Sequence, residues 1–282
     1  MPDERDSPGR PAQGNAPGSH GDPGTGAVVA LVSAKGGAGV SFLSVNLAAE
    51  IAPTDSACVL DLDFSMGDAA AFLDLQPRSG IRDLFGDPDG VGERLISESI
   101  AVHASGIHVL AQPAELVESI DVRGADVMQV MRAVAAAYRY VLVDCGGRID
   151  AATRAATHGA DLVLLVTTPS VVSVRNASRR LQLMQRSGIA RDRIRLVVNK
   201  VGRGNELTQQ DIEKELGMEV AATIADDQAG CEAAVNAGQL LRDVEPRSVA
   251  YADITATVDL IRDRARTVRT GGRAKPFWNI FR

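Results

Sequence analysis

The feature that most restricts the fold of this chain is a series of short, almost continuously apolar runs that alternate with helical stretches. The runs are rich in Val, Leu and Ile and have the length of β-strands, which is typical of strands covered on both faces. They cover residues 27–33, 57–63, 106–112, 140–145, 161–168, 193–199 and 218–224. The helical stretches cover residues 42–51, 123–137, 171–187, 208–216, 229–238 and 249–268. This alternation predicts a three-layer α/β fold, with a mostly parallel, twisted sheet between helices on both faces.

Composition changes at two places along the 282 residues, and these changes set the expected domain boundaries. Residues 1–26 contain eleven Pro and Gly residues and no large apolar side chain other than Met1, so we expect a disordered tail, with a docking tail as the alternative. Residues 27–268 form one domain in the simplest interpretation, because the sequence has neither an internal repeat nor a further break in composition. Residues 269–282 form a basic, aromatic tail.

Charge and cysteine content argue against a polyanion-binding protein, a disulfide framework and a zinc site. The formal net charge of −6 does not favour polyanion binding by the chain as a whole. Cys58, Cys145 and Cys231 are far apart and lie in apolar or helical patterns, which predicts buried thiols in a reducing compartment. No apolar run reaches the roughly 18 residues that a membrane span needs, and no signal peptide is visible. We therefore expect a cytoplasmic protein.

A glycine-rich loop, Ser33-Ala-Lys-Gly-Gly-Ala-Gly-Val-Ser41, joins the first strand to an apolar helical stretch. This order is the context of a phosphate-binding loop, although a glycine-rich turn without a ligand is the alternative. Its glycines would let successive N–H groups face phosphate oxygens, and the dipole of the next helix would add to their effect. Ser41 is placed to bind Mg²⁺ through its hydroxyl. The predicted nucleotide-binding residues are Gly36, Gly37, Ala38, Gly39, Val40, Ser41 and Phe42.

Acidic residues close two other predicted strands. Asp61 and Asp63 are two residues apart, so we expect them to point to the same side, toward the crevice where open α/β sheets bind ligands. Asp144 follows four apolar or aromatic residues and precedes two glycines, which is the form of a Walker B strand whose Asp holds the metal through water. A helix cap or a loop charge would explain each acid separately. Their order at the ends of separate strands favours a nucleotide and Mg²⁺ site.

With these motifs the sequence resembles the ParA/MinD family of deviant Walker ATPases, which have a P-loop NTPase fold of the SIMIBI class. The matching segments are Lys35-Gly-Gly-Ala-Gly, Asp61-Leu-Asp63, Val143-Asp144 and Val198-Asn199-Lys200. Longer stretches, residues 61–85 and 146–179, are similar to the CpaE/TadZ branch, whose members act in Flp (Tad) pilus assembly. The resemblance covers roughly residues 27–260.

The resemblance implies a role for individual residues. Lys35 matches the signature lysine, which reaches across an ATP-sandwich homodimer to the partner's phosphates, and Asp63 matches the acid that positions the attacking water. These two are the expected catalytic residues. Asp144 matches the Walker B acid that binds the metal through water, Ser41 the magnesium ligand and Asn199 the residue that reads the adenine edge. The implied cofactors are ATP or ADP and Mg²⁺.

Two features depart from the family pattern. Val40 occupies the position of the Walker lysine, as happens in TadZ-like members that depart from the usual loop. In addition, only 26 low-complexity residues precede the first strand, where many CpaE-like proteins carry a receiver-like domain. Losing one electrostatic donor typically costs roughly 10²–10³ in rate, whereas main-chain N–H groups, the helix dipole and Mg²⁺ remain for binding. We expect nucleotide binding with slow hydrolysis; the alternative is a scaffold that binds no nucleotide.

Basic residues gather in two further places. Residues 261–282 contain seven Arg or Lys and one Asp, and the stretch 273–282 includes the only Trp. This composition suits a membrane-surface anchor and is similar in outline to the tails that end MinD proteins, with packing on the domain or on a partner as the alternative. Arg175, Arg179 and Arg180 lie on one predicted helix, which we interpret as a solvated face, with weak DNA binding as the alternative.

The leading hypothesis is a nucleotide-dependent, dimeric spatial organiser that positions a Flp/Tad-type pilus or a related secretion machine at the membrane or cell pole. A second hypothesis is an active ATPase for chromosome partitioning or division-site placement, against which the missing lysine argues. A third is a metabolic or metal-cluster enzyme of the wider superfamily, for which neither ligand cysteines nor a substrate domain is evident.

Overall fold

The computed structural model describes residues 26–64, 67–86, 91–113 and 122–270. Within these residues, eight strands form one sheet in the order β3-β4-β2-β5-β1-β6-β7-β8. Neighbouring strands are parallel except β3 and β4, which are antiparallel. The strands are β1 (Ala27–Ser33), β2 (Ala57–Asp61), β3 (Ala101–Val102), β4 (His108–Leu110), β5 (Tyr140–Asp144), β6 (Leu162–Thr167), β7 (Ile194–Val201) and β8 (Val220–Ala225).

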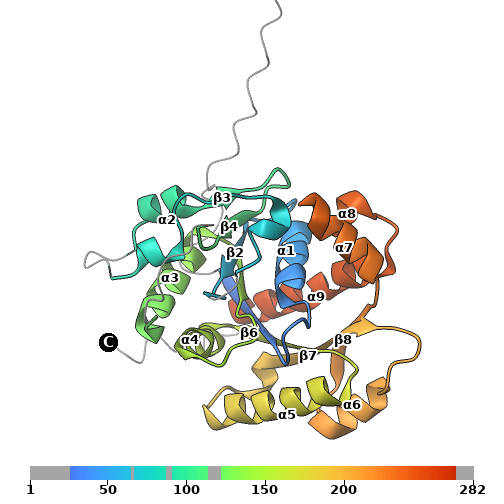
Figure 1. Ribbon diagram of the computed structural model, residues 1–282. Coiled ribbons are helices and arrows are strands. Elements are labelled where there is room, and N and C mark those ends of the chain that lie inside the picture. Colours follow the sequence, from blue (N-terminus) through green and yellow to red (C-terminus); the bar gives the residue numbers. More distant parts are fainter. Residues whose placement is uncertain (1–25, 65–66, 87–90, 114–121, 271–282) are drawn as a thin grey trace, which may run out of the picture.

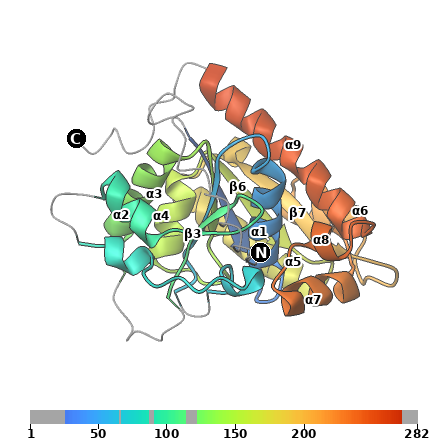
Figure 2. The ribbon, with the colours of Figure 1, turned by 90° about the horizontal axis from the view of Figure 1, so that it is seen from above.

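Helices cover both faces of the sheet, which confirms the predicted three-layer α/β fold (Figure 1). One apolar cluster joins the sheet to α3, α4, α5 and α6, and the other joins it to α1, α7, α8 and α9. Figure 2 shows α3 and α4 well apart from α9, as expected for helices of opposite layers. The helices are α1 (Val40–Ile51), α2 (Glu93–Ser99), α3 (Gly124–Ala137), α4 (Ala151–Gly159), α5 (Val171–Arg186), α6 (Gln209–Leu216), α7 (Gln228–Ala237), α8 (Leu241–Val244) and α9 (Val249–Thr270).

Strand β1 lies inside the sheet, between β5 and β6, and all of its residues are buried. Successive side chains of a strand point to opposite faces. Val28 and Val32 accordingly belong to the cluster under α3 to α6, whereas Val29 and Leu31 belong to the cluster under α1 and α9. The continuous apolar run therefore reflects a strand that is covered by a helix layer on each side.

Several predicted boundaries were wrong. Strand β2 ends at Asp61 rather than residue 63, because Oδ1 of Asp61 accepts a hydrogen bond from the main-chain N–H of Asp63 (2.9 Å) and turns the chain out of the ladder. The predicted strand 106–112 shortens to β4. Helix α4 was not predicted, because its Ala- and Thr-rich sequence contains no large apolar side chain. It begins where Asp150 accepts a hydrogen bond from the N–H of Thr153 (2.8 Å). The short elements α2, α8 and β3 were also missed.

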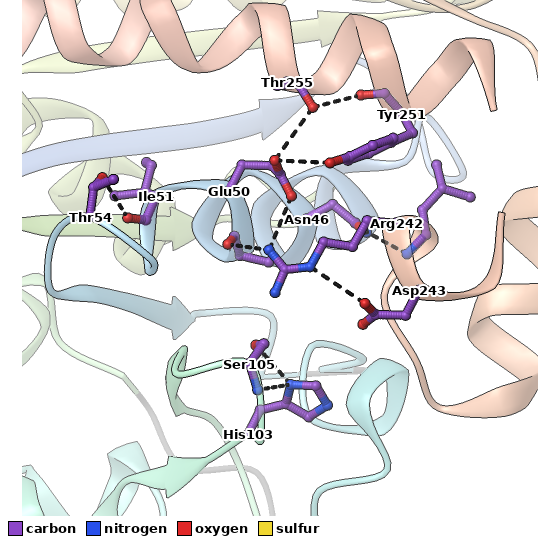
Figure 3. A network of polar contacts seen from close by, with 12 residues as sticks. Asn46, Glu50, Ile51, Thr54, His103, Ser105, Arg242, Asp243, Tyr251 and Thr255 are labelled. Carbon is purple, nitrogen blue, oxygen red and sulfur yellow. Dashed lines mark hydrogen bonds and ion pairs between the residues drawn. The ribbon is translucent and has the colours of Figure 1, made fainter. Parts of the chain in front are cut away.

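Helix α1, which follows the glycine-rich loop, is attached to α8 and α9 by partly buried polar contacts (Figure 3). Glu50 accepts hydrogen bonds from Arg242 Nη1 (3.2 Å) and from the hydroxyl of Tyr251 (3.3 Å). Asn46 Oδ1 accepts a hydrogen bond from the N–H of Leu241 (3.0 Å). The C-terminal helices therefore fix the position of the helix at which the loop ends.

The three cysteines differ in burial. Cys58 and Cys145 are buried as expected, and burial raises the pKa of the Cys58 thiol to about 12; Cys231 is half-buried.

Among the described residues, none of the helices combines the length and the apolar character that crossing a membrane requires. The predicted tail at residues 1–26, apart from Gly26, and the predicted membrane anchor at residues 273–282 lie outside the described residues.

Candidate functional site

The glycine-rich loop and the predicted acids meet at the carboxyl ends of β1, β2 and β5, which are neighbours in the sheet. Leu31 and Asp61 both lie opposite Asp144 in the strand registers. Beyond the ladder, the N–H of Ser33 donates to the carbonyl of Gly146 (3.1 Å). The three segments therefore form one edge, as the sequence predicted.

The loop between β1 and α1 depends on two glycines with positive φ, Gly37 (φ 76°) and Gly39 (φ 91°). Its first turn is held by a hydrogen bond from the N–H of Ala38 to the carbonyl of Lys35 (3.2 Å). A Cβ atom at Gly37 would meet nothing within 4 Å, so the space beside this part of the loop is open. A Cβ atom at Gly39 would lie only 2.5 Å from Nδ2 of Asn199, so a side chain is excluded there.

Helix α1 begins at Val40, with Gly39 as its N-cap, and among the described residues no side chain forms a cap hydrogen bond there. Helices α4 and α5, by contrast, are capped by Asp150 and Ser170. The first N–H groups of a helix have no partner within the helix, and they favour an anion. The beginning of α1 is therefore available to a phosphate group. Phe42, predicted to line the site, is half-buried and packs edge-to-face on Phe72.

Asp144, at the end of β5, is fully buried. Its Oδ1 accepts a hydrogen bond from the N–H of Gly146 (2.9 Å), but within the described residues no hydrogen bond of normal geometry reaches Oδ2. The Ser41 hydroxyl is nevertheless close enough to lower the pKa of the carboxyl group. Burial is the larger influence and, with the nearby charges of Asp63 and Asp68, raises that pKa to about 6.

Asp61 and Asp63 occupy different environments. Asp61 is fully buried and accepts hydrogen bonds from the N–H groups of Asp63 (2.9 Å) and Ala69 (3.3 Å), so it holds the loop that follows β2. Burial, followed by the charge of Asp144, raises its pKa well above the usual range. Asp63 is half-buried, and its carboxylate lies against Gly146, where an added Cβ atom would be 2.4 Å from Oδ2. The structure thus brings all three predicted acids together.

Oxygen atoms of Ser41 and Asp144 fit a magnesium ion that is shared with a nucleotide. Mg²⁺ usually keeps several waters and binds one or two protein oxygens together with phosphate oxygens. The buried Oδ2 of Asp144, which lacks a normal hydrogen bond within the described residues, and the adjacent Ser41 hydroxyl supply such oxygens. A group of three or more His, Cys, Asp or Glu side chains that could hold a metal by itself does not occur in the described part of the chain.

The side chains at positions 35 and 40 differ in exposure. Lys35 is exposed, and its side chain has no hydrogen bond or ion pair with the described residues. Val40 is 4% exposed and belongs to the apolar cluster that includes Leu31 and Leu43. The position of the Walker lysine therefore contributes to the core and carries no charge.

Asn199, predicted to read the adenine edge, supports the loop. It is 7% exposed; Nδ2 donates to the carbonyl of Ala38 (2.8 Å), and Oδ1 accepts from the N–H of Lys200 (2.9 Å). Lys200 itself has a positive φ of 60° beside a register irregularity between β7 and β8. Both polar groups of Asn199 are thus used within the protein, and its contact with adenine stays a prediction.

Arg180, on α5, is a site residue that the sequence interpretation missed. It is only 6% exposed, and burial lowers its pKa. Its Nη2 donates to the carbonyl of Gly147 (2.7 Å) and its Nη1 to the carbonyl of Arg148 (3.3 Å). A Cβ atom at Gly147 would lie 3.7 Å from the nitrogen of Gly36. Arg180 therefore holds the turn that faces the glycine-rich loop.

The prediction that Arg180 belongs to a solvated face was wrong, whereas Arg175 and Arg179 are exposed as predicted. The spacing of residues along the helix distinguishes the buried Arg180 from the exposed Arg175 and Arg179. Residues three and four apart lie on the same helix face, and Arg180 lies three after Ala177 and four before Met184, both of which are buried. The apolar stripe of the helix thus includes Arg180.

Comparison with protein families identifies an AAA domain (AAA_31) over residues 26–192. Among curated proteins, the septum site-determining protein MinD of Thermotoga maritima is 25% identical over 211 residues, which cover 72% of this chain and 76% of the relative.

Solved structures show the same fold. A ParA family ATPase from Chlorobium tepidum TLS superposes with a TM-score of 0.77 at 24% identity, over 82% of this chain and 98% of the other. The septum site-determining protein MinD of Pyrococcus horikoshii OT3, solved as a complex with Mg-ADP, superposes with a TM-score of 0.73 at 16% identity, over 87% and 99% of the two chains.

Proposed function

Because this chain belongs to the ParA/MinD family of AAA-domain proteins, we propose that it binds ATP or ADP with Mg²⁺ at the loop Lys35–Ser41. The observation that carries the proposal is the buried Oδ2 of Asp144, which lies near the Ser41 hydroxyl at the uncapped beginning of α1. The similar MinD of Pyrococcus horikoshii was solved with Mg-ADP.

In this proposal each residue has a defined task. The N–H groups from Gly36 to Ser41 would donate hydrogen bonds to the phosphate oxygens, because the loop and the first turn of α1 orient these groups toward the bound nucleotide. The Ser41 hydroxyl would hold Mg²⁺ directly, and the carboxylate of Asp144 would hold it through a water. When bound, Mg²⁺ supplies positive charge that offsets the charge of the phosphate groups. Asp63, whose carboxylate lies beside Gly146, would orient the water that attacks the terminal phosphate.

The proposed hydrolysis is slow, because position 40 provides no cation. Phosphoryl transfer depends on positioning and on charge stabilisation, and one missing electrostatic donor costs roughly 10²–10³ in rate. Val40→Lys is therefore expected to increase ATP hydrolysis. Since Val40 is nearly buried, Val40→Met serves as the control for packing without charge, and its rate should stay at the level of the parent protein. A parent protein that hydrolyses ATP faster than Val40→Lys would contradict the proposal.

Lys35 is proposed to act across a homodimer that encloses two nucleotides. Its exposed side chain lies at the edge where β1 and β6 end, because Ser33 and Val166 are paired in the sheet. Val172, shortly after β6, is 61% exposed and provides apolar surface for a partner. Lys35→Ala is expected to reduce ATP-dependent dimerisation in sedimentation experiments, whereas the exposed control Lys214→Ala on α6 should leave it unchanged.

Calorimetric titration with Mg-ATP tests the binding proposal itself. The parent protein is expected to bind, and Ser41→Ala should weaken binding by about tenfold or more, which corresponds to about 1.4 kcal/mol. Ser97→Ala, in the exposed part of α2, is the matched control. If the parent protein takes up no nucleotide, the alternative of a non-binding scaffold replaces this proposal.

At the level of the cell, we propose a dimeric spatial organiser for Flp/Tad-type pilus assembly, supported by the similarity of residues 61–85 and 146–179 to the CpaE/TadZ branch. The similarity to MinD over 72% of the chain favours division-site placement as the second candidate. Deleting the gene separates the two: loss of pili with normal septa supports the first, and misplaced septa with normal pili support the second.

A further inference from the structure

A groove of about 130 Å³ lies between α4 and α5, on the helix layer opposite α1. Thr153 and Arg154 line it from α4, Leu183 and Met184 from α5, and Ile149 and Ile189 from the adjoining turns. For comparison, an engineered apolar cavity of roughly 150 Å³ in another protein binds benzene. The groove is therefore large enough for one aromatic or large aliphatic side chain.

Apolar side chains border this groove although they are open to solvent. Ile149 is 53% exposed and Leu183 is 45% exposed, whereas Met184 and Ile189 are buried beneath them. Single exposed apolar residues are common on protein surfaces, but apolar residues gathered around a concave site are typical of binding sites. The groove thus offers an apolar surface to a side chain from another molecule.

The segment that carries the two helices bordering the groove is basic. Residues 146–186 contain six Arg and two Asp, a formal charge of +4 in a chain whose total is −6. On α5, Arg179 and Arg186 lie four residues before and three after Leu183, so they share its face of the helix. Together with Arg154 of α4 they are exposed, and none of these three guanidinium groups has a hydrogen bond or ion pair with the described residues.

We propose that the groove between α4 and α5 is a docking site for an acidic segment of a partner protein, which inserts one large apolar side chain between Ile149 and Leu183. Charge complementarity selects this occupant, since carboxylates beside the apolar side chain would pair with Arg154, Arg179 and Arg186. The chain's own residues 271–282 contain three basic residues and no acid, so like charges oppose their docking. Nucleic acid would match the charge but would leave the apolar groove unfilled.

The position of the groove gives such docking a direct connection to the candidate site. Arg180 lines the groove and also donates to the carbonyls of Gly147 and Arg148. The docked side chain would therefore approach the residue that holds the turn facing Gly36. The docking proposal itself does not depend on nucleotide binding.

Selection from a random twelve-residue peptide library displayed on phage, with the full chain as target, tests the proposal. Enriched peptides are expected to be net negative and to share a large apolar residue. Synthetic versions should bind Leu183→Glu about tenfold or more weakly than the parent chain and should lose affinity with Arg179→Glu. Val249→Glu, which changes another exposed apolar residue outside the groove, is the matched control and should bind as the parent does.

The same proteins are then tested with a 20-base-pair DNA duplex and with phosphatidylglycerol vesicles. Circular dichroism establishes that Leu183→Glu is folded, as its exposure leads us to expect. The proposal is overturned if no peptide is enriched, if the enriched peptides are neutral or basic, or if they bind Leu183→Glu and the parent equally. It is also overturned if only the duplex or the vesicles bind in a manner that depends on Leu183.

Discussion

Gly39 is the point at which the glycine-rich loop, helix α1 and Asn199 meet, and the substitution Gly39→Ala tests this arrangement. Two separate costs are expected. The φ of 91° at Gly39 is a conformation that residues with a side chain rarely adopt, and a positive φ costs such residues roughly 1–2 kcal/mol. The added Cβ atom would also lie 2.5 Å from Nδ2 of Asn199, which is closer than nonbonded atoms approach.

The second cost arises from the hydrogen bonds of Asn199. To make room, its amide must leave the carbonyl of Ala38, to which it donates at 2.8 Å. Losing a hydrogen bond and leaving a buried acceptor without a partner costs about 1–3 kcal/mol. Gly39→Ala is therefore expected to reduce the free energy of unfolding by about 2–5 kcal/mol. Gly188→Ala provides the control, because Gly188 has φ 88° but nothing within 4 Å of an added Cβ atom, so only the first cost applies.

Equilibrium unfolding in urea, followed by circular dichroism, measures both variants. Gly188→Ala should cost about 1–2 kcal/mol, and Gly39→Ala at least about 1 kcal/mol more. In an Asn199→Ala background the clash is absent, so the excess cost of Gly39→Ala should disappear. Equal costs for the two glycines in the parent, or an excess that persists without the Asn199 side chain, would refute the reasoning.

Three further results are expected from the same measurements. Arg180→Ala should reduce the free energy of unfolding by about 2–4 kcal/mol, because it removes a buried side chain together with its two hydrogen bonds to main-chain carbonyls. The exposed Arg179→Ala should change it by less than about 0.5 kcal/mol, and equal effects would contradict a buried role. Asp144 has a raised pKa in the folded protein, so its stabilising contribution is complete below about pH 4 and is lost as the pH rises through about 6. The free energy of unfolding of Asp144→Asn should therefore increase relative to that of the parent over this pH range. A difference between the two proteins that does not change with pH would argue against the burial of the charge. A double-mutant cycle with Glu50→Ala and Arg242→Ala should give a coupling free energy of about 1–3 kcal/mol, since both side chains are mostly buried. A coupling near zero would mean that this ion pair does not hold α1 against α8.

Features that depend on neighbouring residues could be predicted from the sequence. The apolar run of β1, the glycine-rich loop and the helix after it follow from residue types within about fifteen positions, because backbone preference and side-chain alternation are local properties. The place of Asp144 at a strand end also followed from its local pattern, and the parallel order of strands brought it beside the loop.

Features that depend on contacts between distant parts of the chain could not be predicted in this way. Asn199 holds the carbonyl of Ala38 across 161 positions of sequence, and Arg242 reaches Glu50 across 192. The burial of Arg180 depends on the turn after β5, to which its guanidinium donates.

The sequence by itself therefore determined the alternation of strands and helices, the glycine-rich loop and the acidic residues at the strand ends, because each of these depends on a short stretch of residues. Tertiary structure alone decided which charges are buried and which are exposed. Burial raises the pKa of Asp144, places Val40 in the apolar core and distinguishes Arg180 from Arg179. The physical reason is that desolvation depends on every segment packed around a group, and those segments come from all parts of the chain.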